Sequence, residues 1–271
     1  MGKFSSTLYY LIQQVADAFK DSFLGQPASG TTSTALCNTL LQNTANYFAG
    51  FNIHFYLGTH KDITREVTAS SLTNYVTSMT FYSAVTANVD TTDYFQLTKK
   101  FTYKQYQNAV NRAIDIGKDT YLLDKVDDTV TLVSGTQNYA MPTGFLYIDD
   151  IILENEAASN DFYPSARIDE HYYRILPKTT PEVEFDYDNW SVGAGNAGKK
   201  LRIIGQSVQS QLTTDAATCA LKPEFVIAQA ISILAGTEME LFDMGRYWQQ
   251  VADKERKLMS IRPRGVPVFE I

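Results

Sequence analysis

The chain is organised around residues 102–154, which read TYKQYQNAVNRAIDIGKDTYLLDKVDDTVTLVSGTQNYAMPTGFLYIDDIILE. Thr102 and Gln105 have the spacing of a capping box, in which each side chain satisfies a free backbone N–H at the start of a helix. Apolar residues then recur at helical spacing and form one stripe, until Asp127-Asp128 interrupts it. The pattern therefore predicts a long helix that begins at Thr102 and is followed by strands.

Short extended segments follow this helix. Residues 129–133 are β-branched and alternating, which is typical of a strand, and Ser134-Gly135 is a turn signal. Residues 138–141 resume in extended form and stop at Pro142, and the apolar segment 146–153 is another strand candidate. We expect a hairpin over 129–141 that packs with the helix, because neither element can bury its apolar face alone.

Residues 31–99 differ in character from their surroundings, since they are rich in Thr, Ser, Asn and aromatic residues and poor in charge. Regularly spaced short strands with turns between them are typical of a small β-barrel or sandwich. We interpret this segment as a module inserted between an N-terminal helix at 5–20 and the helix that begins at Thr102. Its alternating stretches predict strands at 51–57, 63–69, 76–82 and 94–97.

The C-terminal part predicts helices and then an extended tail. Pro223 fits the first position of a helix, and residues 225–234 are apolar almost all round, which indicates a central, buried helix. A second helix is expected over about 238–259. The tail 261–271 contains two prolines but also several apolar residues, so we expect an extended arm that docks on a partner, or alternatively packs on its own subunit.

Composition limits the function. A chain of 271 residues suffices for one large or two modest domains, and its net charge of −7 argues against a general nucleic-acid binder. The charge is uneven, because residues 119–190 contain 15 acidic and 4 basic side chains. This surplus is either a solvated acidic face or a surface that repels DNA and lets it slide past.

No constellation of residues predicts catalysis. The Gly-rich segment 193–199 matches phosphate-binding patterns, but residues 200–204 after it indicate a strand where such a site needs a helix. His54, His60 and His171 do not have the spacing of metal ligands. We therefore predict that the protein is not an enzyme, with no catalytic residues, no cofactor and no metal site.

Several of these motifs resemble one known family. The segments 113–114, 129–132, 139–142 and Ile148 resemble the helix, strand, Tyr-x-x-Pro arm and Ile/Val-rich strand of head–tail adaptor (connector) proteins of tailed bacteriophages. Segments 201–205 and 212–215, together with the helix from Pro223, resemble the pattern with which members of that family end. Segments 31–34 and 47–50 resemble a β-rich module that larger members of the family contain in addition. The resemblance covers most of residues 31–235.

The resemblance implies a structural virion protein, assembled in the host cytoplasm. Such a protein forms a homo-oligomeric ring, with the twelvefold symmetry of a portal, between the portal and a tail or neck protein. DNA passes through the ring without sequence readout, and no membrane is involved. The alternatives are another neck or tail protein (tail completion, collar or decoration), or a carbohydrate-binding virion module, which exposed aromatics on one strand face of 31–99 would favour.

The expected fold class is α+β, with a helical core, an antiparallel β-domain and an inserted small β-barrel or sandwich-like module. The expected domains are the N-terminal helix and linker (1–30), the inserted module (31–99), the adaptor core (100–260) and the docking tail (261–271). We expect the hairpin and the tail to contact neighbouring subunits or the portal, and part of the acidic surplus to face the channel. The predicted interface residues are Val130, Leu132, Tyr139, Met141, Arg262, Arg264, Val266, Val268 and Phe269.

Overall fold

The computed structural model describes residues 5–42, 44–118, 120–186, 190, 192–237, 241–259 and 265–268. The chain forms two compact units, each with its own sheets. Unit 1 consists of Met1–Gly117 and Ser210–Met259, and unit 2 consists of Lys118–Gln209 and Ser260–Ile271. The predicted adaptor core of 100–260 therefore contributes residues to both units.

The predicted fold class is wrong, because the described residues are mostly β and form no helical core. In the described residues the strands form four sheets, and the four α-helices are short. The sequence patterns missed many strands of two to four residues, such as β2 (Phe23–Gly25) and β4 (Thr34–Cys37). A segment of that length has too few positions to show the period of two by which a strand is recognised.

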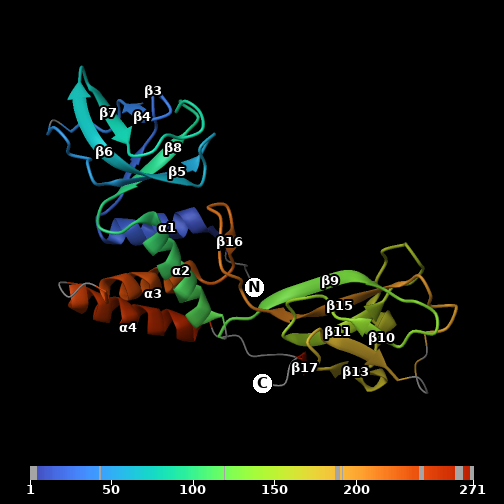
Figure 1. Ribbon diagram of the computed structural model, residues 1–271. Helices are drawn as coiled ribbons and strands as arrows, with labels where there is room; N and C mark the ends of the chain where they lie inside the picture. The colour runs from blue at the N-terminus through green and yellow to red at the C-terminus, as the bar shows by residue number, and fades with distance from the viewer. Residues whose placement is uncertain are drawn as a thin grey trace. The chain divides into compact units, whose positions relative to one another are not determined.

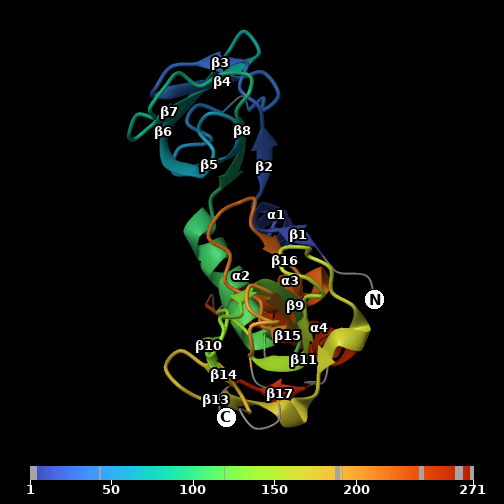
Figure 2. The ribbon, with the colours of Figure 1, turned by 90° about the vertical axis from the view of Figure 1, so that its right-hand side faces the viewer.

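Unit 1 contains a sheet of seven antiparallel strands in the order β2-β8-β5-β6-β7-β4-β3 (Figures 1 and 2). All four strands predicted for the module are confirmed. Within the described residues the edge strands β2 and β3 do not pair with each other, so the sheet is not closed and the predicted barrel is wrong. The remaining strands of this sheet are β3 (Ser29–Gly30), β5 (Asn52–Leu57), β6 (Ile63–Thr73), β7 (Val76–Phe81) and β8 (Tyr94–Thr98).

The two faces of β5 and β8 differ in polarity although both are buried. Alternation places Phe55 and Phe95 in the apolar core of this sheet. The register pairs His54 with Gln96 across the two strands, and both side chains are buried, 3% and 0% exposed. The sheet therefore carries a buried polar face, which short-range sequence patterns did not indicate.

The capping box at the start of α2 (Tyr103–Gly117) is confirmed. The Thr102 N–H donates to Gln105 Oε1 at 2.7 Å, and the Gln105 N–H donates to Thr102 Oγ1 at 3.3 Å. The helix ends at Gly117, where a Cβ would come within 2.5 Å of the Phe225 ring. A larger residue there would force the Phe225 ring to shift.

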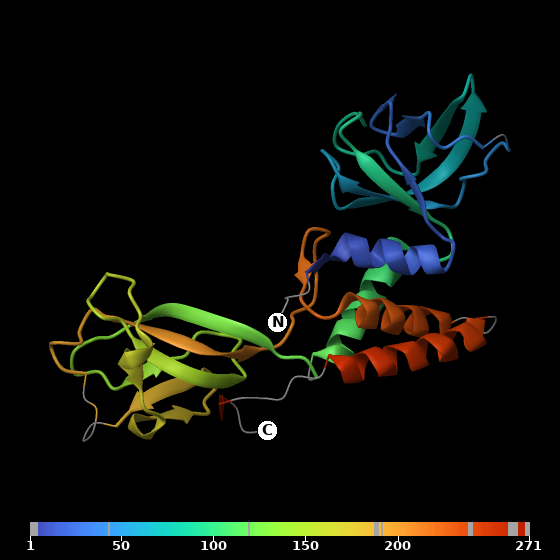
Figure 3. The ribbon, with the colours of Figure 1, turned by 180° about the vertical axis from the view of Figure 1, so that it is seen from behind.

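The helix α3 (Pro223–Ala235) is buried almost all round, as its composition predicted. It packs against the other three helices of unit 1, and Figure 3 shows it alongside α4. The other helices are α1 (Leu8–Ala18) and α4 (Phe242–Leu258). A two-stranded sheet of β1 (Ser6–Thr7) and β16 (Thr218–Cys219) completes the unit.

Unit 2 consists of two sheets around one apolar core. The five-stranded sheet has the order β12-β11-β15-β9, with β17 also paired to β11, and the three-stranded sheet has the order β10-β14-β13. Two short 3-10 helices, η1 (Pro164–Ala166) and η2 (Glu170–Tyr172), flank β12. The strands are β9 (Leu123–Thr131), β10 (Asn138–Ala140), β11 (Tyr147–Leu153), β12 (Arg167–Ile168), β13 (Tyr173–Leu176), β14 (Glu182–Phe185), β15 (Lys200–Ser207) and β17 (Val266–Pro267).

The predicted hairpin over 129–141 is wrong, because β9 and β10 belong to different sheets. β9 pairs with β15, and β10 pairs with β14. The connection between them is closed by the Tyr139 hydroxyl, which accepts from the Val133 N–H at 2.9 Å and lies 3.0 Å from the Val133 carbonyl oxygen. A side chain thus replaces the strand pairing that the sequence predicted.

Candidate assembly surface

The strand β9 offers an edge for pairing with another chain. It is nine residues long, and one of its sides pairs with β15. Among the described residues no strand pairs with its other side, so β9 ends the sheet. A long edge strand presents a row of backbone N–H and C=O groups, which is a template for strand addition.

Exposed apolar side chains accompany this edge. Val126 on β9 is 57% exposed, and Val133 just beyond the strand is 58% exposed. Asp124, Asp127 and Asp128 also lie on β9, and Asp128 pairs with Arg202 at 3.3 Å. Acidic side chains on an edge discourage unselective pairing, so this edge favours a partner whose charge complements it.

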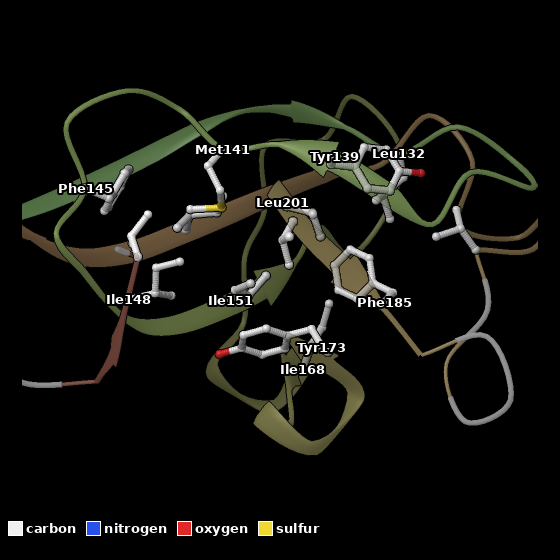
Figure 4. Packing of buried hydrophobic residues seen from close by; sticks show 14 residues of the cluster. Leu132, Tyr139, Met141, Phe145, Ile148, Ile151, Ile168, Tyr173, Phe185 and Leu201 are labelled. Carbon is white, nitrogen blue, oxygen red and sulfur yellow. The ribbon is translucent and has the colours of Figure 1, made fainter. Parts of the chain in front are cut away.

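The predicted contact residues of the 129–141 segment belong to the interior of unit 2. Leu132, Tyr139 and Met141 are 1%, 8% and 4% exposed, and Val130 packs against the same core. Figure 4 shows Leu132, Tyr139 and Met141 in one cluster with side chains of both sheets. These residues stabilise the fold, whereas the exposed Val133 on this segment and the exposed Val126 before it were missed.

The described part of the tail packs on its own unit. Val266 pairs with Ile148 of β11, and Val268 is 2% exposed and donates its N–H to the Leu146 carbonyl oxygen at 2.8 Å. This is the alternative that the sequence left open beside docking on a partner. Arg262, Arg264 and Phe269 lie outside the described residues.

Part of the acidic surplus of 119–190 is paired within unit 2. Ion pairs join Asp150 to Arg167 at 2.5 Å and Glu182 to Lys178 at 2.6 Å, and another joins Glu184 to Arg174. Glu154 is fully buried and accepts two backbone N–H groups, at 2.6 and 2.7 Å. Whether the exposed remainder faces a channel stays a prediction.

Among the described residues one group of side chains has the spacing of metal ligands. It consists of His54, Asp62 and Asp215 of unit 1, whose ligand atoms all lie within 4.8 Å of one another. Local sequence patterns do not reveal this group, because Asp215 lies far along the chain from His54 and Asp62. No spacing pattern could have connected them.

Comparisons with known proteins add no family: no protein-family model and no curated protein matches this chain. None of the described helices is long and apolar enough to cross a membrane. Any function must therefore be argued from the residues and the geometry.

Proposed function

We propose that the protein is a structural virion protein, a head–tail adaptor of a tailed bacteriophage. It forms a homo-oligomeric ring between the portal and the tail, and DNA passes through that ring. The resemblance over residues 31–235 supports this proposal. The observation that carries it is the edge strand β9, which lacks a partner on one side among the described residues and is accompanied by exposed Val126 and Val133.

Strand addition at β9 suits a ring. When an edge on one subunit meets a different surface on the next, the contact is heterologous, and repeated contacts of this kind form a ring when the rotation between subunits closes. The backbone groups of β9 give affinity, and Val126 and Val133 add apolar area that is desolvated on contact. β9 carries three aspartates and one lysine, and Asp128 is already paired with Arg202, so the remaining net negative charge favours a surface that carries positive charge.

The acidic balance fits a protein that passes DNA without holding it. Each phosphate contact made by a lysine or arginine adds affinity, and would slow DNA that moves through a ring. The chain has a net charge of −7, and unit 2 contains most of the acidic surplus. A protein of this charge interacts weakly with the DNA backbone, as a passage requires.

The carbohydrate-binding alternative gains no support from the aromatic residues. Phe48, Phe55 and Phe95 are buried in the core of the seven-stranded sheet. Tyr75 and Tyr82 are about 80% exposed, but Tyr75 lies in the turn between β6 and β7 and Tyr82 directly after β7. They do not form the row along one strand face that stacking on a sugar chain would use.

The experiment replaces the exposed apolar residues of the edge. Val126→Lys combined with Val133→Lys should leave the circular dichroism spectrum unchanged, because both positions are more than half exposed. The same variant should no longer form rings, alone or on a portal, when viewed by negative-stain electron microscopy. Lysine is a residue by which natural proteins block edge pairing.

The matched control is Tyr163→Lys, since Tyr163 is 51% exposed in the same unit but precedes η1 and does not belong to β9. It should assemble like the wild type. Normal rings from the double variant would remove β9 from the interface. A wild-type protein that stays monomeric with and without a portal would refute the adaptor function itself.

A further inference from the structure

Three side chains from separate segments of unit 1 converge on one point. His54 lies on β5, Asp62 lies in the turn before β6, and Asp215 lies in the segment before β16. Their ligand atoms all lie within 4.8 Å of one another. His54 and Asp215 are 3% and 4% exposed, whereas Asp62 is exposed, so the group is open to solvent on one side.

The imidazole of His54 is held in a fixed orientation. Its Nδ1 lies 2.8 Å from the Thr64 hydroxyl, and its Nε2 lies 2.7 Å from Asp215 Oδ2. The Tyr103 ring stacks on the imidazole, with centroids 3.4 Å apart and planes within 9°. A metal-binding histidine characteristically has its second nitrogen held by such a hydrogen bond, which fixes the tautomer and the plane of the ring.

The carboxylates are held in the same way. The Tyr103 hydroxyl donates to Asp215 Oδ1, which leaves Oδ2 toward His54. The Asp215 N–H donates to Asp62 Oδ1 at 3.2 Å and holds the second carboxylate close to the first. Among the described residues no lysine or arginine forms an ion pair with either aspartate, so the pair leaves negative charge that a bound cation would neutralise.

A further polar group beside His54 has an unused acceptor. Gln96 is the cross-strand partner of His54 and is fully buried. Its Nε2 donates to the Ser22 hydroxyl at 3.0 Å, but its Oε1 has no hydrogen-bond partner in the described part of the chain. A buried unpaired acceptor needs a donor, and a water molecule bound to a nearby cation would supply one.

We propose that His54, Asp62 and Asp215 bind one divalent transition-metal ion, for which Zn²⁺ is the best match. One imidazole nitrogen and two carboxylates suit zinc, whereas Ca²⁺ and Mg²⁺ require about six or more oxygen ligands. Zinc ligands lie about 2.0–2.2 Å from the ion, so their mutual distances are about 3.4 Å in a tetrahedral site. The His54 Nε2 and Asp215 Oδ2 atoms are closer than that, at 2.7 Å, and all the ligand atoms lie within 4.8 Å of one another, so shifts of the side chains alone would accommodate the ion.

The bound ion would connect segments that are distant in sequence. It would join β5 and the turn after it to the segment before β16, and so tie the seven-stranded sheet to the rest of unit 1. Because the unfolded chain does not hold these ligands together, the binding free energy would stabilise the folded unit. The role inferred is a structural staple, independent of the assembly surface in unit 2.

The test is calorimetric titration of the metal-free full chain with ZnCl₂ at neutral pH. One ion per chain should bind. Asp62→Asn should weaken that binding at least about tenfold, because it removes a charged ligand from an exposed position. The variant should fold normally, since Asp62 has a φ of 66° and asparagine tolerates this left-handed conformation. Its melting temperature without metal should equal that of the wild type.

Two controls distinguish this site from adventitious binding. The side chain of His171 is 86% exposed, and its Nδ1 lies 2.6 Å from Asp169 Oδ1. His171→Ala therefore removes the histidine that is most open to adventitious Zn²⁺ binding at the surface. Glu66→Gln removes an exposed acidic residue from β6. Both variants should bind Zn²⁺ as the wild type does, and Ca²⁺ should not bind.

Three outcomes would overturn the proposal. The first is that the wild type binds no Zn²⁺. The second is that Asp62→Asn binds with unchanged affinity, or that His171→Ala abolishes binding. The third is that Ca²⁺ binds at the site more tightly than Zn²⁺, which would indicate an oxygen-only site without His54.

Discussion

The two units hold distant segments together by different means. In unit 1, buried carboxylates collect donors from remote parts of the chain. Asp21 is 5% exposed and accepts the N–H groups of residues 99, 100 and 101 and the Tyr106 hydroxyl, and Asp93 contacts His60 where both are fully buried. Unit 2 has one such carboxylate among its described residues, Glu154, and otherwise relies on its apolar core, with ion pairs on the surface.

This difference predicts that substitutions of different kinds lower the stability of the two units. A buried carboxylate that accepts several hydrogen bonds is costly to replace, because its loss leaves each of those donors unpaired in a site that water does not reach. An apolar core is less directional, and loses stability with the size of the cavity that a substitution leaves. Unit 1 should therefore be sensitive to single polar changes and to acid, and unit 2 to the loss of apolar volume.

The largest effect is expected at Asp21. Asp21→Ala should lower the free energy of unfolding of unit 1 by about 4 kcal/mol, because three backbone donors and the Tyr106 hydroxyl lose their acceptor. Urea denaturation measures the loss, and hydrogen exchange of peptides from each unit locates it. Asp17→Ala, at an exposed position of α1, is the control and should change stability by less than about 0.5 kcal/mol. Equal effects of the two changes would contradict the comparison.

The next effect is expected in the core of unit 2. Met141→Ala should lower the stability of that unit by about 3 kcal/mol, because Met141 is 4% exposed and its removal leaves a cavity. Faster hydrogen exchange should be confined to peptides of unit 2. Val126→Ala, which shortens an exposed side chain, should leave exchange unchanged. If Met141→Ala left unit 2 as stable as before, its apolar core would not be what holds the sheets together.

An intermediate effect is expected from acid on unit 1. Burial alone raises the pKa of Asp215, but hydrogen bonds and charge from His54, and a hydrogen bond from Tyr103, outweigh it and hold the pKa below its usual range. A lowered pKa stabilises the fold above the unfolded value of about 3.9, and this stabilisation is lost as the pH falls through the folded value.

Hydrogen exchange of unit 1 should therefore accelerate as the pH falls from about 5 toward 3, after correction for the intrinsic exchange rate. Asp215→Asn should show a smaller change with pH, because the titrating carboxyl is gone. An Asp215→Asn variant with the full acid sensitivity of the wild type would assign that sensitivity to other groups.

The smallest effect is expected at the surface of unit 2. Lys178→Ala removes an ion pair with Glu182, in which the lysine side chain is 50% exposed. The loss should be about 0.5 kcal/mol or less, because solvent and salt screen an exposed pair. Thermal unfolding in low and high salt measures it. A loss comparable to that of Met141→Ala would show that surface charge, and not the core, stabilises this unit.

The candidate site was only partly predictable from sequence. The segment 129–141 was identified as a place of contact, but the side chains chosen there, Tyr139 and Met141, face inward in the structure. Alternation shows which residues share a face of a strand, but not which face the core covers. That choice depended on the pairing of β9 with β15 and of β10 with β14.

The sequence alone determined the elements whose signals are local. The capping box at Thr102, the four longer strands of the 31–99 module and the apolar helix after Pro223 are confirmed. Each rests on residues within a turn or two of one another, where propensity and periodicity act. The tertiary structure decided the fold class, the edge position of β9 and the approach of Asp215 to His54. These features depend on contacts between residues that are remote in sequence. Many such pairings are possible, and the one that forms leaves no periodic pattern in the sequence.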